Sequence, residues 1–242
     1  MESDVNEYLG EFFGTMILIF LGDGVVAGVL LNRTKAQNAG WMVVTTAWAF
    51  AVLFGILTAR AIGAPGYVNP VGPFVAALNG NLPVDKALGL AGAEVLGAFA
   101  GAILVWLHYL PHWAETPDPG LKLGVFCTIP AIRNAAANVI SEALGTFVLV
   151  FAGAAITEKA LGPNLGVPTV AFLVWGIGLS LGATTGYAIN PARDFGPRLA
   201  HAMLPIPGKG SSDWGYAWVP ILGPLLGAAV GALAVRQFMS SV

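Results

Sequence analysis

The stretch Asn190-Pro191-Ala192-Arg193 decides the fold, together with a related stretch, Asn69-Pro70-Val71, in the other half of the chain. Each follows an apolar run and opens a segment too short to cross a bilayer. Asparagine is a favoured N-cap and proline is favoured at the first helical position, so Asn-Pro predicts a helix start. Two half-length helices that start at membrane depth would point their N–H groups and positive dipole ends at a common place. We expect the functional site there.

The composition around these motifs is typical of a polytopic helical membrane protein. Hydrophobic residues make up 56% of the 242 residues, charged residues only 10%, and the mean hydropathy is +0.75. A soluble domain carries about a quarter charged residues. The net charge of −2 argues against a nucleic-acid partner. The first apolar run follows an acidic N-terminus without basic residues, which favours a retained span over a signal peptide.

The apolar runs predict an all-α membrane protein of six transmembrane helices and two re-entrant half-helices. Each full span is long enough to cross about 30 Å of hydrocarbon. A long extramembrane connection at about 109–137 is expected between the third and fourth spans, within one channel domain covering 1–242. The six spans are expected at roughly 8–31, 40–61, 86–108, 138–158, 168–187 and 215–237.

Matching markers indicate that the two halves, about 8–108 and 138–237, are repeats. Each half holds three full spans, an odd number, so the second copy must enter the membrane upside down. This predicts an inverted repeat with its site at the midplane between the halves. The markers, in the same order in both halves, are Glu11-Phe12-Phe13-Gly14-Thr15 with Glu142-Ala143-Leu144-Gly145-Thr146, the two Asn-Pro motifs, and Gly97 and Gly101 with Gly223 and Gly227.

The backbone before each Asn-Pro motif is expected to be extended and to line a water-filled path. Non-helical backbone at membrane depth is tolerated only where protein shields it or where it lines a wet cavity. The side-chain amides of Asn69 and Asn190 would act as donors at the centre of this path. The carbonyls expected to serve as acceptors along it are those of Pro65, Gly66, Tyr67, Gly186 and Ala188.

The acidic residues Glu11, Glu142 and Asp23 lie within apolar spans. An ionisable group inside a membrane is a functional candidate by default. Glu11 and Glu142 occupy equivalent repeat positions, and this duplication favours a structural role in which each accepts hydrogen bonds from a non-helical loop. Asp23 has no acidic counterpart, because Ala154 occupies the equivalent position. Asp23 could hold a loop or face the outer part of the path.

Arg193 stands on the first turn of the second half-helix, where the helix dipole disfavours a cation. Its charge must therefore be compensated by carbonyl acceptors or be kept for function. A fixed positive charge beside two positive helix ends would repel cations, protons included. The commoner interpretation of the nearby Asp194 and Arg198 is that they are interfacial polar residues.

The stretch from Thr185 to Arg198 resembles the second signature of the aquaporin, or major intrinsic protein, family. The aspartate after Arg193 is similar to the aquaglyceroporin branch of glycerol facilitators, and Gly22–Gly28 resembles its bacterial members, some of which pass lactic acid. The first motif departs from the family pattern, with Val71 in place of alanine and Tyr67 in place of histidine. The resemblance implies a homotetramer in a bacterial plasma membrane with cytoplasmic termini.

The resemblance also implies a constriction of four residues, placed here by their spacing from the two motifs: Trp48, Gly178, Tyr187 and Arg193. Two aromatic rings opposite a glycine would leave a wide apolar wall facing Arg193. Such a wall suits an amphipathic polyol, whose CH groups can contact the rings while its hydroxyls bind Arg193 and backbone carbonyls.

The predicted function is a passive channel for small uncharged solutes such as glycerol, for water and for undissociated lactic acid, excluding ions and protons. No cofactor or metal is expected, because His108, His112 and His201 lack metal-site spacing. No catalytic constellation is found, so an enzyme is not expected. The alternative is an ion-coupled secondary transporter with Asp23 and Glu94 as coupling sites. It predicts saturable, gradient-driven accumulation, whereas a channel predicts flux linear in solute.

Overall fold

The structure is a computed structural model that describes residues 2–156, 161 and 165–239, and every regular element in these ranges is a helix. Five helices are long and apolar enough to cross a membrane, and a sixth, α9, is shorter, with 16 residues. The six are α1 (Glu2–Leu30), α2 (Trp41–Ile62), α4 (Val84–His108), α7 (Ala135–Ala154), α9 (Gly166–Leu181) and α11 (Val219–Phe238).

Two further helices begin at the Asn-Pro motifs, as the sequence predicts. They are α3 (Val71–Leu78), with 8 residues, and α10 (Pro191–Met203), with 13. The first is the shorter of the two. Pro73 gives its early turns no N–H to donate, and Gly80, with φ 75°, follows its end in the left-handed conformation that commonly ends helices.

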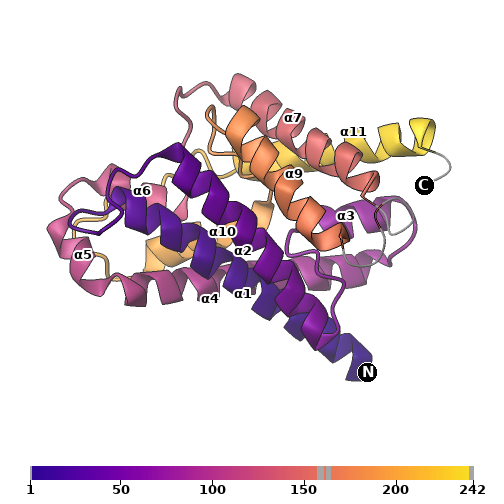
Figure 1. Cartoon of the computed structure of the whole chain (residues 1–242), viewed down its shortest axis with the longest axis horizontal. Helices are drawn as coiled ribbons and strands as arrows, with labels where there is room; N and C mark the ends of the chain where they lie inside the picture. The colour runs from indigo at the N-terminus through magenta and orange to yellow at the C-terminus, as the bar shows by residue number, and fades with distance from the viewer. Residues whose placement is uncertain (1, 157–160, 162–164, 240–242) are drawn as a thin grey trace.

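The long helices pack in two groups, α1 with α2 and α4, and α7 with α9 and α11, and α9 also packs against α2 of the first group (Figure 1). The half-helices join these groups, because α3 contacts α11 as well as α4, and α10 contacts α4 as well as α11. Each half-helix therefore lies between its own half of the chain and the other half.

Equivalent glycines allow the helices of each group to approach closely. A Cβ atom added to Gly97 of α4 would lie 2.1 Å from the Phe12 carbonyl oxygen of α1. A Cβ atom added to Gly227 of α11 would lie 2.1 Å from the Ala143 carbonyl oxygen of α7. Small residues let membrane helices pack backbone against backbone, and here the two halves use the same device.

One expected boundary was wrong, and another falls partly outside the described residues. The span expected at 168–187 ends at Leu181, and residues 182–185 form a turn before the extended stretch 186–190. The fourth span was expected to reach residue 158. In the structure α7 ends at Ala154, and residues 157–158 lie outside the described part of the chain.

The connection at 109–137 is more ordered than a plain loop. It contains α5 (Leu110–Glu115) and α6 (Pro119–Phe126). The carboxylate of Asp118 accepts a hydrogen bond from the Gly120 N–H at 2.7 Å, and Pro119 opens α6, an N-cap followed by proline that fits a helix start. Because α6 packs against both α1 and α10, this connection reaches the interior of the protein.

Candidate functional site

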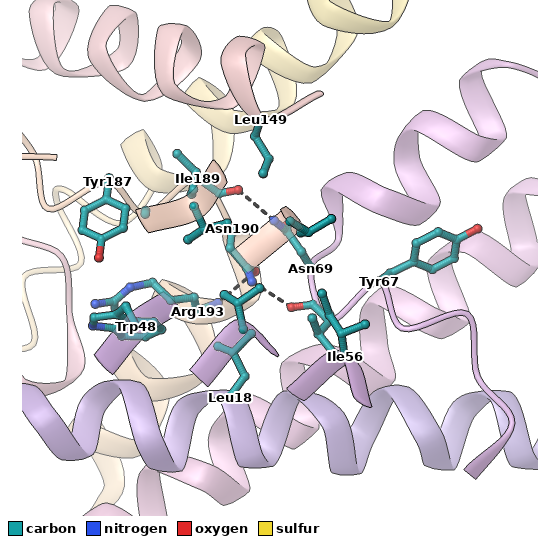
Figure 2. A pocket seen from close by; sticks show the side chains of 15 residues that line it. Leu18, Trp48, Ile56, Tyr67, Asn69, Leu149, Tyr187, Ile189, Asn190 and Arg193 are labelled. Carbon is teal, nitrogen blue, oxygen red and sulfur yellow. Dashed lines mark hydrogen bonds between the residues drawn. The ribbon is translucent and has the colours of Figure 1, made fainter. Parts of the chain in front are cut away.

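The tips of the two half-helices are joined by reciprocal hydrogen bonds (Figure 2). The Asn69 side-chain nitrogen Nδ2 donates to the Ile189 carbonyl oxygen at 2.9 Å. The Asn190 Nδ2 donates to the Val68 carbonyl oxygen at 2.8 Å. Each asparagine of one half is thus bonded to the extended backbone of the other half, and the two motifs meet at one point.

The other end of each amide is fixed on its own helix. Asn190 Oδ1 accepts from the N–H groups of Ala192 at 3.0 Å and Arg193 at 3.2 Å, and Asn69 Oδ1 accepts from the Val71 N–H at 3.0 Å. With oxygen and nitrogen both engaged, neither amide can rotate freely. One N–H of each amide has no partner in the described chain and is available to a molecule in the central cavity.

The backbone before each motif is extended but contains left-handed residues. In the first half Gly66 and Val68 have φ of 80° and 46°. In the second half Gly186, Tyr187 and Ile189 have φ of 84°, 36° and 40°. A positive φ at a non-glycine residue is strained by roughly 1–3 kcal/mol, so other contacts must stabilise these segments.

Two buried carboxylates provide this stabilisation. Glu11 of α1 accepts from the N–H groups of Gly66 at 2.7 Å, Tyr67 at 2.9 Å and Val68 at 2.7 Å. Glu142 of α7 accepts from Ala188 and Ile189, both at 2.9 Å. These bonds give the N–H groups of the two extended segments an acceptor and so hold both segments in place.

A third carboxylate takes part in one half only. Glu94 of α4 accepts from the Asn69 N–H at 3.0 Å and is fully buried. The repeat places Pro220 at the equivalent position, so the second copy lacks this carboxylate. The sequence suggested a role for Glu94 only in the alternative transporter. Its position within the repeated segment that contains Gly97 was the signal that could have indicated a structural role.

Three cavities follow one another through the molecule. The α3-side cavity, about 570 Å³, contains Arg60 and Asn79 in its lining. It shares Tyr67 and Asn69 with a narrow central cavity of about 90 Å³. The central cavity in turn shares Trp48, Tyr187 and Arg193 with an α6-side cavity of about 400 Å³. These shared residues place the three cavities along a single path past the asparagines.

Of the four residues expected at the constriction, Trp48, Tyr187 and Arg193 lie together where the central and α6-side cavities meet. Gly178 lies beside the Tyr187 ring and lines neither cavity. The guanidinium carbon of Arg193 lies 4.3 Å from the centroid of the Trp48 ring, a cation–π contact. The Tyr187 hydroxyl is directed toward Trp48 and the Arg193 guanidinium and has no hydrogen-bond partner in the described chain (Figure 2).

Gly178 does not open the constriction as expected. A Cβ atom added there would lie 2.8 Å from Cζ of Tyr187 and 3.1 Å from Cγ2 of Thr45, so the Tyr187 ring already occupies the space beside the glycine. Trp41, which sequence reasoning missed, supports this arrangement. Its Nε1 donates to the Gly178 carbonyl at 3.0 Å, and its ring meets Tyr187 edge to face at 5.8 Å.

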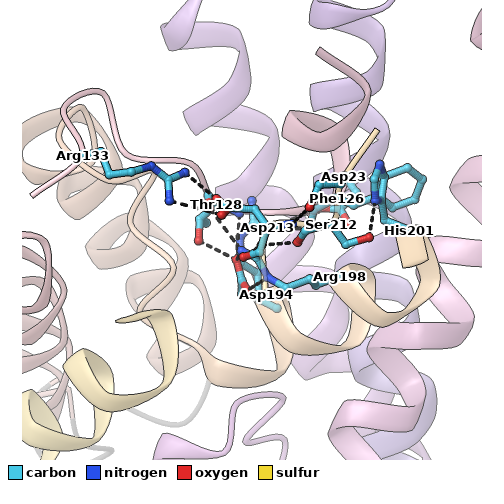
Figure 3. A network of polar contacts seen from close by, with 11 residues as sticks. Asp23, Phe126, Thr128, Arg133, Asp194, Arg198, His201, Ser212 and Asp213 are labelled. Carbon is cyan, nitrogen blue, oxygen red and sulfur yellow. Dashed lines mark hydrogen bonds and ion pairs between the residues drawn. The ribbon is translucent and has the colours of Figure 1, made fainter. Parts of the chain in front are cut away.

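Asp194 and Arg198 are not interfacial, contrary to the commoner interpretation given above. Both are fully buried, and Arg198 Nε lies 2.7 Å from Asp194 Oδ1 (Figure 3). Asp194 Oδ2 also accepts from Thr128 N at 2.8 Å and Oγ1 at 2.6 Å. Arg198 Nη1 donates to the carbonyls of Ser212 at 2.7 Å and Asp213 at 3.1 Å. The pair therefore ties the segment after α6 and the loop after α10 to the second half-helix. Its i, i+4 spacing was the sequence signal.

Asp23 lies beside the constriction rather than beneath a loop. It is fully buried on α1, and its Oδ1 is 3.5 Å from Arg193 Nη1. Arg193 Nη1 also lies 3.5 Å from the Phe126 carbonyl oxygen. Neither of the two roles that the sequence left open for Asp23 is found. Asp23 accepts no hydrogen bond from a described loop and lines none of the three cavities, so it meets the path only through Arg193.

The described residues contain no group of three or more His, Cys, Asp or Glu side chains arranged to hold a metal. Two of the histidines have structural contacts. Nδ1 of His201 lies 2.9 Å from Ser212 Oγ, and Nδ1 of His112 lies 3.0 Å from the Asn32 carbonyl oxygen.

Comparisons with known proteins agree with this architecture. The model of the family described as "Major intrinsic protein" matches residues 2–235. A probable glycerol uptake facilitator protein from Thermotoga maritima is 55% identical over 94% of this chain and 97% of its own length. A D/L-lactic acid transporter from Lactiplantibacillus plantarum is 37% identical over 97% of this chain and 98% of its own.

A solved structure shares the fold. The X-ray structure of the aquaglyceroporin from Plasmodium falciparum superposes with a TM-score of 0.84 at 24% identity, covering 98% of this chain and 97% of that one. The resemblance inferred from the Asn-Pro-Ala-Arg stretch is thereby confirmed. The chain is an integral membrane protein that belongs to the major intrinsic protein family.

Proposed function

We propose that this protein is a passive channel for glycerol and similar small uncharged solutes, and that water and undissociated lactic acid also pass. The observation that carries the proposal is the single path of three cavities, narrowed by Trp48, Tyr187 and Arg193 and crossed by the bonded Asn69 and Asn190. Relatives named as glycerol uptake facilitators and as a lactic acid transporter support the choice of solutes.

The constriction has the chemistry that a polyol needs. The Trp48 ring offers an apolar face to CH groups, while the Arg193 guanidinium and the unpartnered Tyr187 hydroxyl offer hydrogen bonds to the hydroxyls of the solute. Permeation requires that such sites replace the hydration of the solute without trapping it. One aromatic wall and two polar groups satisfy both conditions.

The centre of the path is proposed to exclude cations and protons. Two half-helices direct the positive ends of their dipoles at it, and the free N–H of each asparagine amide acts as a donor. A water molecule held by both donors must present its oxygen to them, which interrupts a chain of proton transfers. Carbonyls of the extended segments, proposed to include those of Pro65, Gly66, Tyr67, Gly186 and Ala188, would guide the solute on either side.

The ion-coupled transporter alternative gains no support. Its two candidate coupling residues already have partners, Asp23 with Arg193 and Glu94 with the Asn69 N–H. Neither contributes to the lining of the three cavities.

We further infer one channel domain, 1–242, built of inverted repeats at about 8–108 and 138–237, and a homotetramer with cytoplasmic termini. Large apolar side chains project outward from both halves of the chain and would contact membrane lipid or neighbouring copies. They include Phe13, Leu21, Phe50 and Phe54 in the first half, and Ile140, Leu144, Phe172 and Leu179 in the second.

Reconstituted vesicles test the proposal. Stopped-flow light scattering should show glycerol and water entering much faster than in protein-free vesicles, with glycerol flux linear in its gradient. Lactic acid uptake should rise as the pH falls, since the undissociated acid is the permeant form. Solute accumulation driven by a sodium or proton gradient, or glycerol flux no faster than in empty vesicles, would refute the channel.

A further inference from the structure

Asp23 is a buried carboxylate with an unusual lack of donors. Neither of its oxygens accepts a hydrogen bond in the described part of the chain, and the residue is completely buried. Its polar contact is with Arg193, at 3.5 Å from Oδ1 to Nη1. A buried carboxylate without a partner is strongly disfavoured, so the role of Asp23 must be sought in its contact with Arg193.

The other buried carboxylates near the path have structural duties that Asp23 lacks. Glu11 and Glu142 hold the extended backbone, and Asp194 is saturated by Arg198 and Thr128. The repeat equivalent of Asp23 is Ala154, so the fold of one half is completed without a carboxylate at this position. The presence of Asp23 therefore needs an explanation that applies only to the first half of the chain, where α1 lies beside Arg193.

The packing of α1 brings Asp23 to the constriction. A Cβ atom on the preceding residue, Gly22, would lie 2.4 Å from Cζ3 of Trp48, so only glycine lets α1 lie directly against that ring. Trp48 in turn lies against the guanidinium of Arg193. The carboxylate and the ring both contact the guanidinium, at the place where the central and α6-side cavities meet.

Among the residues that the structure describes, Asp23 is the acidic side chain that forms an ion pair with Arg193. It stands in the first turn of α10, where the helix dipole adds to its positive potential, and the adjacent Asp194 is committed to Arg198. The Phe126 carbonyl, at 3.5 Å from Nη1, is a neutral acceptor. Without Asp23, the constriction would combine a guanidinium with a helix N-terminus, an arrangement that binds anions.

We propose that Asp23 is a specificity-determining positioning residue that acts through Arg193. It holds Nη1 on the α1 side and cancels the guanidinium charge, so that the constriction offers N–H donors to uncharged solutes without becoming an anion site. This inference rests on the proposed channel function, because it assigns the reason why that channel would prefer neutral solutes and release them.

The test measures competition by a small anion. Glycerol flux is recorded in vesicles containing sodium formate or, at equal ionic strength, sodium gluconate, whose anion is too large to enter the constriction. Wild type should be insensitive to the exchange. Asp23→Asn, which keeps the shape and removes the charge, should be inhibited by formate at concentrations roughly tenfold below the highest one that leaves wild type unaffected, since a charge at this distance in a buried site is weakly screened.

Two further variants identify the cause. Asp23→Ala removes charge and bulk together, and it should show the same formate sensitivity. In an Arg193→Gln background, Asp23→Asn should add no sensitivity, because the anion site needs the guanidinium. Glu115→Gln is the matched control, since it removes the same charge from an exposed pair with Arg33 and should behave as wild type.

A thermal shift in detergent gives a readout that does not require flux. Formate should stabilise Asp23→Asn but not wild type, because a ligand raises the melting temperature of the state that binds it. If the Asp23 variants conduct glycerol and respond to formate as wild type does, the inference is overturned while the channel proposal remains. If wild type fails to conduct glycerol, the proposed function fails, and the thermal shift still decides the anion site. If both Asp23 variants misfold, and adding Arg193→Gln does not restore their folding, then Asp23 has a structural role and the inference is overturned.

Discussion

The face of the Trp48 ring supports the guanidinium of Arg193, with 4.3 Å between the ring centroid and the guanidinium carbon. Trp48 comes from the middle of α2 and Arg193 from the first turn of α10, so the contact joins the two halves of the chain at the constriction. The same ring lines the central and α6-side cavities. One side chain is therefore both a wall of the path and a support for its cation.

Trp48→Ala should widen the path and loosen Arg193. The lost ring removes a buried cation–π contact of up to about 2 kcal/mol and leaves a void beside the central cavity. We expect longer polyols such as ribitol to pass several-fold faster, with less discrimination against them relative to glycerol. Stopped-flow measurements with a series of polyols test this. Trp214→Ala, at an exposed loop position, is the control, and equal profiles for both variants would contradict the assignment of Trp48.

Gly178→Ala should narrow the path by displacing Tyr187. The new methyl group would lie 2.8 Å from Cζ of Tyr187, 3.0 Å from its hydroxyl oxygen and 3.1 Å from Cγ2 of Thr45, so it cannot fit unless a neighbour moves. The ring must move toward the central cavity. Glycerol flux should fall more than water flux, and Gly178→His should reduce glycerol flux further.

Gly176→Ala is the matched control for this experiment. It lies two residues away on the same helix, and nothing lies within 4 Å of a Cβ atom placed there. It should leave both fluxes unchanged. Equal loss of water and glycerol flux in the Gly178 variants would show that Tyr187 does not govern solute size.

Glu11→Gln and Glu142→Gln should each destabilise the protein. Each carboxylate accepts backbone N–H groups with both oxygens, and the glutamine amide nitrogen would replace one acceptor by a donor. A buried N–H left without an acceptor costs about 1–3 kcal/mol. Thermal unfolding in detergent should show a clear decrease in melting temperature for both.

Glu7→Gln serves as the control, because Glu7 pairs with Lys86 at 2.8 Å near the surface, where an ion pair contributes about 0–1 kcal/mol. Should the two buried variants be no less stable than the control, the carboxylates would not be what holds the extended segments.

The sequence predicted the central part of this site because its signals are local and duplicated. Asn69 and Asn190 mark helix starts by their own capping chemistry, and Glu11 and Glu142 stand out as ionisable groups at matching positions in apolar spans. An inverted repeat then brings the two motifs together without knowledge of any side-chain contact. The same reasoning correctly expected extended backbone before Asn190, although it set the end of the preceding span several residues too late.

The rest of the site depends on contacts between segments far apart in the chain. Nothing near Asp23 in the sequence points to Arg193, 170 residues later, and only the packing of Gly22 against Trp48 brings them together. The burial of Asp194 likewise depends on Thr128, which belongs to a connection that was expected to be an extramembrane loop. The filling of the Gly178 space by Tyr187 follows from a backbone twist that no composition signal indicates.

Asn190→Asp should weaken the exclusion of cations at the centre of the path. The amide nitrogen that donates to the Val68 carbonyl would become a carboxylate oxygen facing that carbonyl at about the same distance, and the two acceptors would repel each other. The remaining oxygen could still cap α10 through Ala192 and Arg193, so the half-helix should persist. A negative charge would then stand between the two positive helix ends, and only the Asn69 amide would still donate to the path.

The expected result is a proton and sodium leak that wild type lacks, with glycerol flux retained in part. Vesicles loaded with a pH-sensitive dye and exposed to an imposed pH gradient measure the leak. Asn81→Asp places the same charge in the lining of the α3-side cavity, away from the asparagine pair, and should not leak. A leak of equal size from both variants would mean that general surface charge, rather than the donors at the half-helix tips, controls cation exclusion. If the Asn190→Asp channel leaks neither protons nor sodium ions, the main barrier to cations must lie at Arg193 rather than at the asparagines.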